Sequence, residues 1–240
     1  MKDQYFGDVN DYRKYGLLRG LSQEGSFSLG ICWMLTPNDG RSDGRFVEYA
    51  AHPGRWRQFD PSLFDSMTLA LGTADGRHVT HVPHLGFLSG AHFFDALLTD
   101  QPQSRVGYFE AMFTAFANAQ MIFFDPDNGL EVRSTPYGSR GSSKYLYWRE
   151  ASEAFARGHS LVMYQHFPRQ KRSPFLTQMG RAISEHTRAK YVYAATTSNV
   201  SFFFAVQGAH AERAEHALRS ISRRWSGQIT FLPDVNRSGT

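Results

Sequence analysis

The sequence predicts an α/β fold in which a mostly parallel β-sheet is covered by helices on both faces. From residue 105 onward, segments with the apolar spacing of a helix alternate with short, continuously apolar segments typical of strands buried on both sides. The helical segments are long enough to connect parallel strands. A later pair of apolar segments is joined by a turn too short for such a crossover, which predicts an antiparallel hairpin.

The expected elements begin with an amphipathic helix at 11–22. Its inward face would carry Tyr12, Tyr15, Leu18 and Leu21. An apolar strand at 29–35 follows, and the loop after it stands where the first strand-to-helix turn of an open sheet binds a cofactor.

The remaining elements complete one sheet. Strands parallel to the first are expected at 120–125 and 160–166, an edge hairpin at 191–197 and 200–206, a further strand at 228–233, and helices at 105–119, 144–158, 175–186 and 212–225. This pattern predicts a single Rossmann-like domain over residues 1–240, with an irregular or helical embellishment at about 45–105.

Composition limits the class of protein. The chain is 41% hydrophobic and 20% charged, which suits one globular domain with a sizeable core. Its one cysteine, Cys32, lies in an apolar segment, so we expect a core residue, no disulfide and a reducing compartment. No segment approaches the roughly 20 apolar residues of a membrane span, and the N-terminal segment lacks the apolar region of a signal peptide. We therefore expect a cytoplasmic protein without a membrane partner.

The charge distribution favours a phosphate-rich partner. The net charge is +4 and the pI is about 9.2, and the basic residues occur in clusters along the chain. Such clusters are typical of nucleic-acid binding, to RNA or DNA. A solvated, arginine-rich surface is the alternative explanation.

A tight turn with two carboxylates and an amide follows the apolar segment 121–124. It reads Asp125-Pro126-Asp127-Asn128-Gly129. Ligands of open α/β sheets bind beyond the carboxyl ends of the strands, so the position favours a functional site. Neighbouring carboxylates also need a cation, a proton or a metal ion. Because Asp-Pro and Asn-Gly are ordinary turn dipeptides, a purely structural turn is the alternative.

Two further segments carry candidate site residues. In 6–15, Asp8 or Asn10 can cap the first helix, and Asp11 and Lys14 would share one face of it; a cap with a surface ion pair is the alternative.

The segment 163–172 would place basic side chains beside the Asp125 turn, where they can hold phosphates; a solvated loop is the alternative. These candidate substrate-binding residues are His166, Arg169, Lys171 and Arg172.

The histidines His78, His81 and His84 do not indicate a metal site. Residues three apart lie on opposite faces of a strand, Pro83 argues against a helix across them, and no cysteine accompanies them. We expect no metal in the favoured interpretation.

The order of these motifs resembles an uncharacterised bacterial family with FGD-x-NDYRKYGLLR and FFDPDNGLEV. More distantly, it resembles the adenine amino-methyltransferases that modify large-subunit ribosomal RNA. Their N-terminal signature is similar to Gly-Asn-x-x-Asp-x-x-Lys-His, and their catalytic turn is of the Asp-Pro-Pro-Tyr type. The matching residues here are Gly7, Asp8, Asp11, Lys14 and Tyr15, and Asp125 to Asn128.

The resemblance implies a Rossmann-like S-adenosylmethionine methyltransferase that acts on a base amine of a nucleic acid. Asp125 and the carbonyl of Pro126 would accept the N–H groups of the amine, Asp127 and Asn128 would contact the base edge, and Lys14 would lie at the pocket floor. The implied cofactor-binding residues are Asp8, Asp11, Thr36, Gly40 and Gly44.

Three features depart from the family pattern. Asn128 stands where an aromatic residue stacks on the flipped base. Gly40 and Gly44 lack the tighter spacing that lets the backbone approach the cofactor. The strand whose terminal acid would hold the cofactor ribose should precede Arg105, and 97–104 is too short to contain it.

Two other interpretations stay open. Asp125 and Asp127 can instead bind Mg²⁺ through oxygen ligands, with Asp8 or Asp11 joining them and His166 and Lys14 assisting a nuclease or phosphohydrolase reaction. The chain can also be a non-enzymatic module that binds nucleic acid or another partner on a decayed methyltransferase fold.

Overall fold

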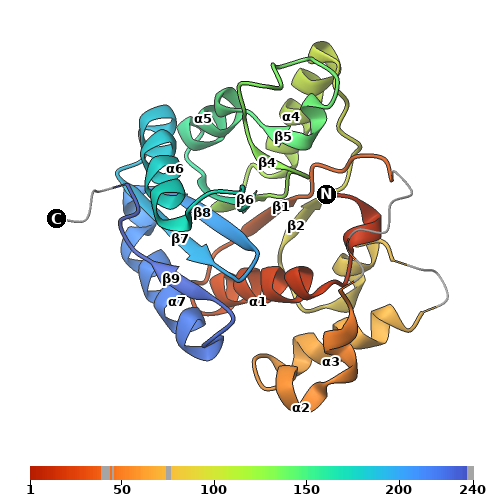
Figure 1. Cartoon of the computed structure of the whole chain (residues 1–240). Helices are drawn as coiled ribbons and strands as arrows, with labels where there is room; N and C mark the ends of the chain where they lie inside the picture. The colour runs from red at the N-terminus through yellow and green to blue at the C-terminus, as the bar shows by residue number, and fades with distance from the viewer. Residues whose placement is uncertain (39–43, 45, 74–76, 237–240) are drawn as a thin grey trace.

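The computed structural model describes residues 1–38, 44, 46–73 and 77–236. A seven-stranded sheet has the order β2-β1-β3-β6-β8-β7-β9. Its strands are β1 (Leu29–Cys32), β2 (His92–Phe94), β3 (Met121–Phe124), β6 (Ser160–His166), β7 (Tyr191–Thr196), β8 (Val200–Val206) and β9 (Thr230–Leu232). β2, β1, β3 and β6 run parallel, which confirms the prediction for the three strands that the sequence identified. The fold is a Rossmann-like α/β fold (Figure 1).

The antiparallel hairpin of β7 and β8 is also confirmed, with one difference in its placement. β8, the second strand of the hairpin, pairs with β6 and so lies between β6 and β7 in the sheet. β9 pairs antiparallel with β7 and forms the outer edge.

Helices cover both faces of this sheet, as predicted (Figure 1). On one face lie α1 (Val9–Gln23), α3 (Pro61–Leu71) and α7 (Ala211–Arg224); on the other lie α4 (Pro102–Ala115), α5 (Trp148–Ala156) and α6 (Arg172–Thr187). Successive strand residues supply the two cores because side chains alternate across a strand: Phe123 faces α1, whereas Phe124 faces the opposite layer.

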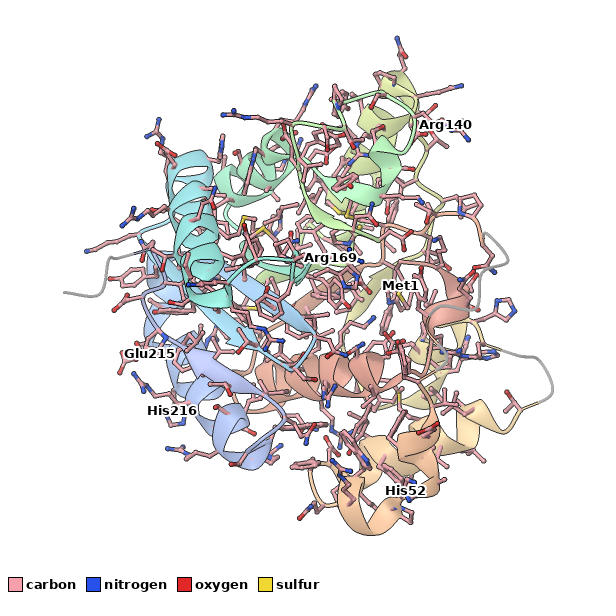
Figure 2. The ribbon with its side chains drawn as sticks, viewed as in Figure 1. Met1, His52, Arg140, Arg169, Glu215 and His216 are labelled. Atoms are coloured by element: carbon pink, nitrogen blue, oxygen red, sulfur yellow. The ribbon has the colours of Figure 1, made fainter. Side chains whose placement is uncertain are left out.

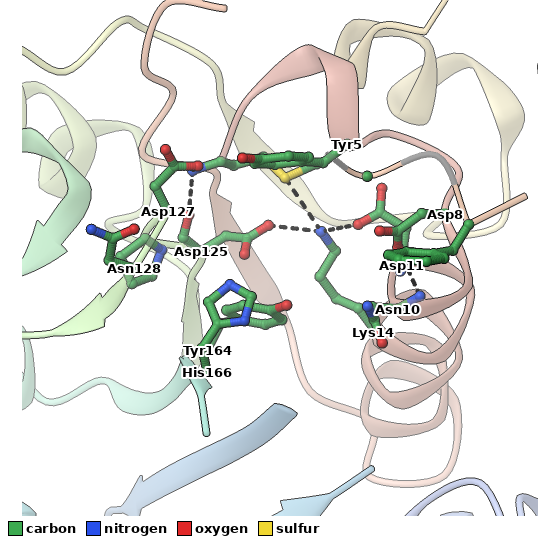
Figure 3. Close-up of a pocket in the computed structure, with 14 residues that line it drawn as sticks. Tyr5, Asp8, Asn10, Asp11, Lys14, Asp125, Asp127, Asn128, Tyr164 and His166 are labelled. Atoms are coloured by element: carbon green, nitrogen blue, oxygen red, sulfur yellow. Dashed lines mark hydrogen bonds and ion pairs between the residues drawn. The ribbon is translucent and has the colours of Figure 1, made fainter. Parts of the chain in front are cut away.

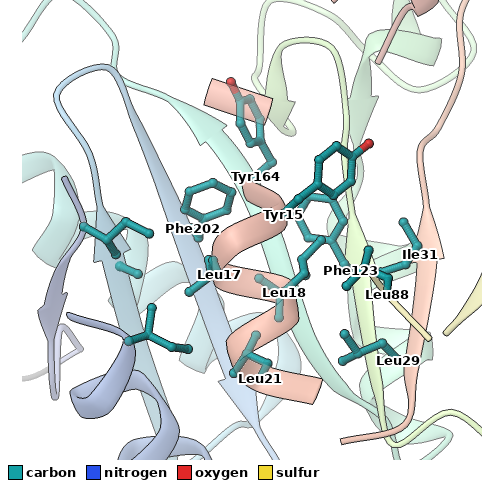
Figure 4. Packing of buried hydrophobic residues seen from close by; sticks show 14 of the residues in the cluster. Tyr15, Leu17, Leu18, Leu21, Leu29, Ile31, Leu88, Phe123, Tyr164 and Phe202 are labelled. Carbon is teal, nitrogen blue, oxygen red and sulfur yellow. The ribbon is translucent and has the colours of Figure 1, made fainter. Parts of the chain in front are cut away.

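α1 is central because it connects the core to the site. Its inward residues Tyr15, Leu18 and Leu21 are fully buried and belong to the same hydrophobic cluster as Phe123 of β3 (Figure 4). Its backbone lies so close to α7 that a Cβ at Gly16 would come within 2.1 Å of the Trp225 ring. This close packing fixes the amino end of α1 relative to the sheet.

The segment expected to be an embellishment is helical and also contributes to the sheet. It contains α2 (Pro53–Trp56), α3 and the 3-10 helices η2 (Glu48–Ala51) and η3 (Val79–Leu85), followed by β2. β2, a strand of only three residues, was not predicted from the sequence. η3, a 3-10 helix of seven residues, runs through Pro83, so the expectation that this proline prevents a helix was wrong.

Short elements complete the described chain. They are η1 (Asp3–Tyr5), β4 (Gly129–Leu130), η4 (Ser142–Lys144), β5 (Tyr145–Leu146) and η5 (Gly208–His210). β4 and β5 form a two-stranded parallel pair directly after the Asp125 turn. Across the residues that the structure describes, no helix combines the length and apolarity needed to span a bilayer.

Candidate functional site

A pocket of about 300 Å³ opens beyond the carboxyl ends of β3 and β6, beside the amino end of α1 (Figure 3). Its lining comes from segments far apart in the sequence. The lining residues are Met1, Tyr5, Asp8, Asn10, Asp11, Lys14, Gly44, Phe46, Asp125, Pro126, Asp127, Asn128, Tyr164 and His166. We expect from the order of the motifs that Asp8 or Asp11 shares a cleft with Asp125 and Lys14, and both Asp8 and Asp11 line this pocket with them.

Lys14 joins the two motifs at the floor of this pocket. Its Nζ lies 2.6 Å from Asp11 Oδ1 and 2.7 Å from Asp125 Oδ2, and the residue is 1% exposed (Figure 3). Burial alone would lower the pKa of Lys14, but the two carboxylates raise it well above its ordinary value. The ion pair of Asp11 and Lys14 is thus buried, and the alternative of a surface pair is wrong.

Asp125 is held at three points. Its N–H donates to the Cys32 carbonyl at 3.0 Å, its carbonyl accepts from the Met1 amino group at 2.9 Å, and Lys14 holds Oδ2. Within the described part of the chain, Oδ1 of Asp125 makes no hydrogen bond. A fixed carboxylate with one uncommitted oxygen is thereby presented at the end of β3.

Asp127 has different partners. Lys2 Nζ lies 3.0 Å from Oδ2, the Met1 amino group lies 3.5 Å from Oδ1, and the Thr36 hydroxyl donates to Oδ2 at 3.4 Å. Although burial opposes it, the charges of the Met1 amino group and Lys2 hold the pKa of Asp127 below its ordinary value. The two carboxylates of the turn are consequently neutralised by separate ammonium groups.

The chain after the turn is held by η4 and by β6. Asn128 N–H donates to the Lys144 carbonyl at 2.8 Å, and Leu130 N–H donates to Gln165 Oε1 at 2.7 Å. Gly129 has a φ of +112°, and a Cβ there would come within 2.3 Å of the same Gln165 oxygen. A glycine is therefore required for this turn to approach β6.

The wall opposite α1 is formed by β6. The rings of Tyr164 and His166 meet edge to face, with centroids 5.0 Å apart (Figure 3). Desolvation lowers the pKa of His166 despite the nearby charges of Asp125 and Asp127. A neutral imidazole can both donate and accept a hydrogen bond at the pocket wall.

Of the four predicted substrate-binding residues, only His166 lines the pocket. The other three follow it in the chain and are exposed, and Figure 2 labels Arg169 among them. Arg172 lies over the Phe167 ring, 4.6 Å from its centroid, and donates to the Ser198 carbonyl. Because β3 and β6 are neighbours, this basic segment does begin at the pocket.

The predicted cofactor-binding residues are divided in the same way. Asp8, Asp11 and Gly44 line the pocket, whereas Thr36 is buried and its N–H donates to the Met1 carbonyl at 2.9 Å. Gly40 lies outside the described residues. Met1 therefore lies in the crevice between the ends of β1 and β3, where the sequence predicted a cofactor loop.

The structure adds residues that the sequence analysis did not select. Tyr5, Phe46 and Tyr164 bring aromatic rings to the pocket. Asp95 directly follows β2 and is exposed, so an acid-ended strand does precede Arg105. The sequence signal for this strand was the pair Phe93 and Phe94 before Asp95, and two apolar residues are too few to show strand periodicity.

The chain matches no protein-family model, and no curated protein or solved structure matches it either. Its function must therefore be inferred from the geometry and chemistry of this pocket.

Asp8→Asn is expected to make the protein more stable at pH 7.5 and to leave its stability unchanged near pH 4. Burial and the charge of Asp11 raise the pKa of Asp8 to about 7. Between the unfolded value near 4 and this value, the folded protein binds a proton that the unfolded chain has lost. Stability therefore falls with rising pH across this window, by at most about 1.4 kcal/mol per pH unit.

Urea unfolding of both proteins at pH 4, 5.5 and 7.5 measures this effect. Asparagine preserves the cap, because Asp8 Oδ1 accepts from the Asn10 and Asp11 N–H groups and an amide oxygen can replace it. Asp60→Asn is the control, since Asp60 caps α3 but pairs with Arg19 at 3.1 Å, so its neutralisation should not stabilise. A pH-independent difference between Asp8→Asn and the wild type would contradict the prediction.

Proposed function

We propose that this protein is an S-adenosylmethionine-dependent methyltransferase that acts on a base amine of a nucleic acid. One observation carries the proposal: Lys14 fixes the Asp125 carboxylate at the end of β3 and leaves its Oδ1 free beside Pro126, within the pocket. Such a group accepts a hydrogen bond from an amine without having to be reorganised first.

The residues of the turn act on the nucleophile. The lone pair of an exocyclic amine is delocalised into its ring, so the amine is a poor nucleophile. When Asp125 Oδ1 and the Pro126 carbonyl accept its two N–H groups, the nitrogen is held in place and becomes more tetrahedral. Asp125 also stabilises the positive charge that the nitrogen gains as a new bond forms.

The carboxyl ends of β1 and β2 suit the cofactor. Asp95 is exposed, and no ion pair involves it among the described residues; its carboxylate can accept from ribose hydroxyls. Leu97 is an exposed apolar side chain in a parallel bridge with Leu35, which suits an adenine ring. When bound, the cofactor supplies an electrophilic methyl group. Met1 occupies the neighbouring crevice between the ends of β1 and β3, so the cofactor would bind at the ends of β1 and β2.

The partner of this site would be a nucleic acid, RNA or DNA. Arg169 and Lys171 are exposed directly after β6, and no ion pair engages either of them within the described chain. Unpaired basic side chains beside a base pocket can hold the phosphates on either side of the target nucleotide.

A magnesium-dependent nuclease is a weaker proposal on the same residues. Its two ligands would be Asp125 and Asp127, but Lys14 binds one and Lys2 the other. A divalent ion would have to displace both ammonium groups. Within the described residues, no group of three or more His, Cys, Asp or Glu side chains converges as ligands.

Titration calorimetry with S-adenosylmethionine tests the proposal. We expect the wild type to bind, and Asp95→Asn to weaken binding about tenfold, since it removes a charged acceptor for hydroxyl donors. Asp65→Asn is the matched control, because it removes an exposed carboxylate that pairs with Arg57. The absence of heat with S-adenosylmethionine, together with heat from Mg²⁺, would favour the nuclease.

A further inference from the structure

Phe46 is an exposed aromatic side chain at the mouth of the pocket. It is 67% exposed, whereas the other strongly exposed large apolar residues in the described chain are aliphatic. Its backbone is fixed, because its carbonyl accepts from the Val9 N–H at 3.0 Å at the start of α1. A large ring held in water beside a polar pocket is available to a ligand.

The charges of the lining select the kind of ligand. The carboxylates of Asp8, Asp11, Asp125 and Asp127 line the pocket, and the ammonium groups among the described lining residues are those of Lys14 and of Met1, which lies 3.5 Å from Asp127 Oδ1. Lys14 is already bound by two of these carboxylates. An anionic group such as phosphate would be repelled, whereas a neutral group with N–H donors would find acceptors.

The volume of the pocket limits the size of the ligand. A volume of about 300 Å³ is at the lower end for small-molecule pockets, and it admits one planar ring system. Tyr164 and His166 form the wall on β6, and Phe46 belongs to the side of α1. With Tyr5 of η1, the lining therefore offers aromatic surface from three separate segments and acceptors at its floor.

We propose that Phe46 is the stacking surface for a neutral heteroaromatic ring that bears an exocyclic amine, with the amine directed to Asp125. The inference rests on the proposed function and deepens it, because it names the residue that holds the substrate base. Stacking on Phe46 is tolerant of ring identity, since every base has a π-face. Discrimination comes from Asp125 Oδ1, which is left without a donor when the amine is replaced by a carbonyl.

Binding of nucleosides without cofactor tests this assignment. Equilibrium dialysis should show that the wild type prefers adenosine to inosine, and that Phe46→Ala weakens adenosine binding about tenfold or more. Phe46→Trp should restore it. Leu69→Ala is the matched control, because Leu69 is 73% exposed on α3 and does not line the pocket.

Asp95→Asn separates the two possible places for adenosine. If the nucleoside binds at Phe46, this variant keeps wild-type affinity; loss of binding in Asp95→Asn but not in Phe46→Ala would place adenosine at the ends of β1 and β2 and overturn the assignment. Equal binding of adenosine and inosine, or no binding of either, would also overturn it. Phe46-dependent binding without any heat from S-adenosylmethionine would reject the methyltransferase and keep the base pocket.

Discussion

Asp125→Asn is expected to lower methyl transfer by about 10²- to 10⁴-fold while the protein stays folded. The amide has the shape of the carboxylate, but it replaces one acceptor oxygen with a donor and removes the charge that stabilises the developing ammonium. Lys14 keeps its contact with Asp11 at 2.6 Å, so the variant does not leave this cation without a carboxylate. The measurement is transfer of labelled methyl from S-adenosylmethionine to a nucleic acid, with thermal melting of the same samples.

Asp127→Asn is the comparison. Asp127 pairs with Lys2 and does not contact Lys14, so methyl transfer should fall only modestly. In a magnesium site that shares both carboxylates, either change should instead abolish most of the Mg²⁺ affinity. Wild-type turnover in Asp125→Asn would show that the turn is only structural.

Long periodic elements were predictable, and short ones were not. The apolar runs at 121–124 and 161–164 are continuous, so their strand character and parallel direction followed from the sequence. β2 has three residues and pairs only with β1, so no local pattern distinguishes it from a loop. Its position is set by the sheet edge that β1 offers rather than by its own sequence.

The site was predictable where a motif carries its own geometry. Asp11 and Lys14 lie one turn apart on α1, and the turn at Asp125 follows a strand, so both could be placed before the fold was known. The exposure of Phe46 at the pocket and the position of Asp95 at the sheet edge could not be predicted, because both depend on the tertiary structure. Nothing local marks an apolar residue as exposed, and only the sheet order brings Asp95 to the carboxyl edge beside β1.

Lys14→Met is expected to destabilise the protein by about 3–5 kcal/mol at pH 7.5, the usual cost of leaving buried charges without their partner. Asp11 and Asp125 would both lose the cation that lies within 2.7 Å of them. Arg57→Met is the control, because Arg57 and Asp65 form an exposed pair whose loss should change stability little. Urea unfolding measures each free energy.

The pH dependence identifies the cause of this loss. Burial already raises the pKa of Asp11 despite Lys14, and removal of Lys14 would raise it further. A carboxyl whose folded pKa exceeds its unfolded value contributes less stability as pH rises through that interval, so Lys14→Met should be least destabilised near pH 4 and most destabilised near pH 8. In the wild type, the pKa of Lys14 is raised. The contribution of Lys14 to the free energy of unfolding therefore persists from pH 4 to pH 8 and declines only in strong alkali.

A double variant separates charge from packing. Asp11→Asn with Lys14→Met removes one cation and one carboxylate together, and the asparagine oxygen can still accept from the Gly7 N–H, which Asp11 Oδ2 now binds at 3.0 Å. The double variant should therefore be more stable than Lys14→Met alone, with a weaker dependence on pH. Equal losses in the single and double variants at every pH would mean that Lys14 stabilises the fold through its buried hydrocarbon chain, and that the Asp125 carboxylate does not depend on it for its position.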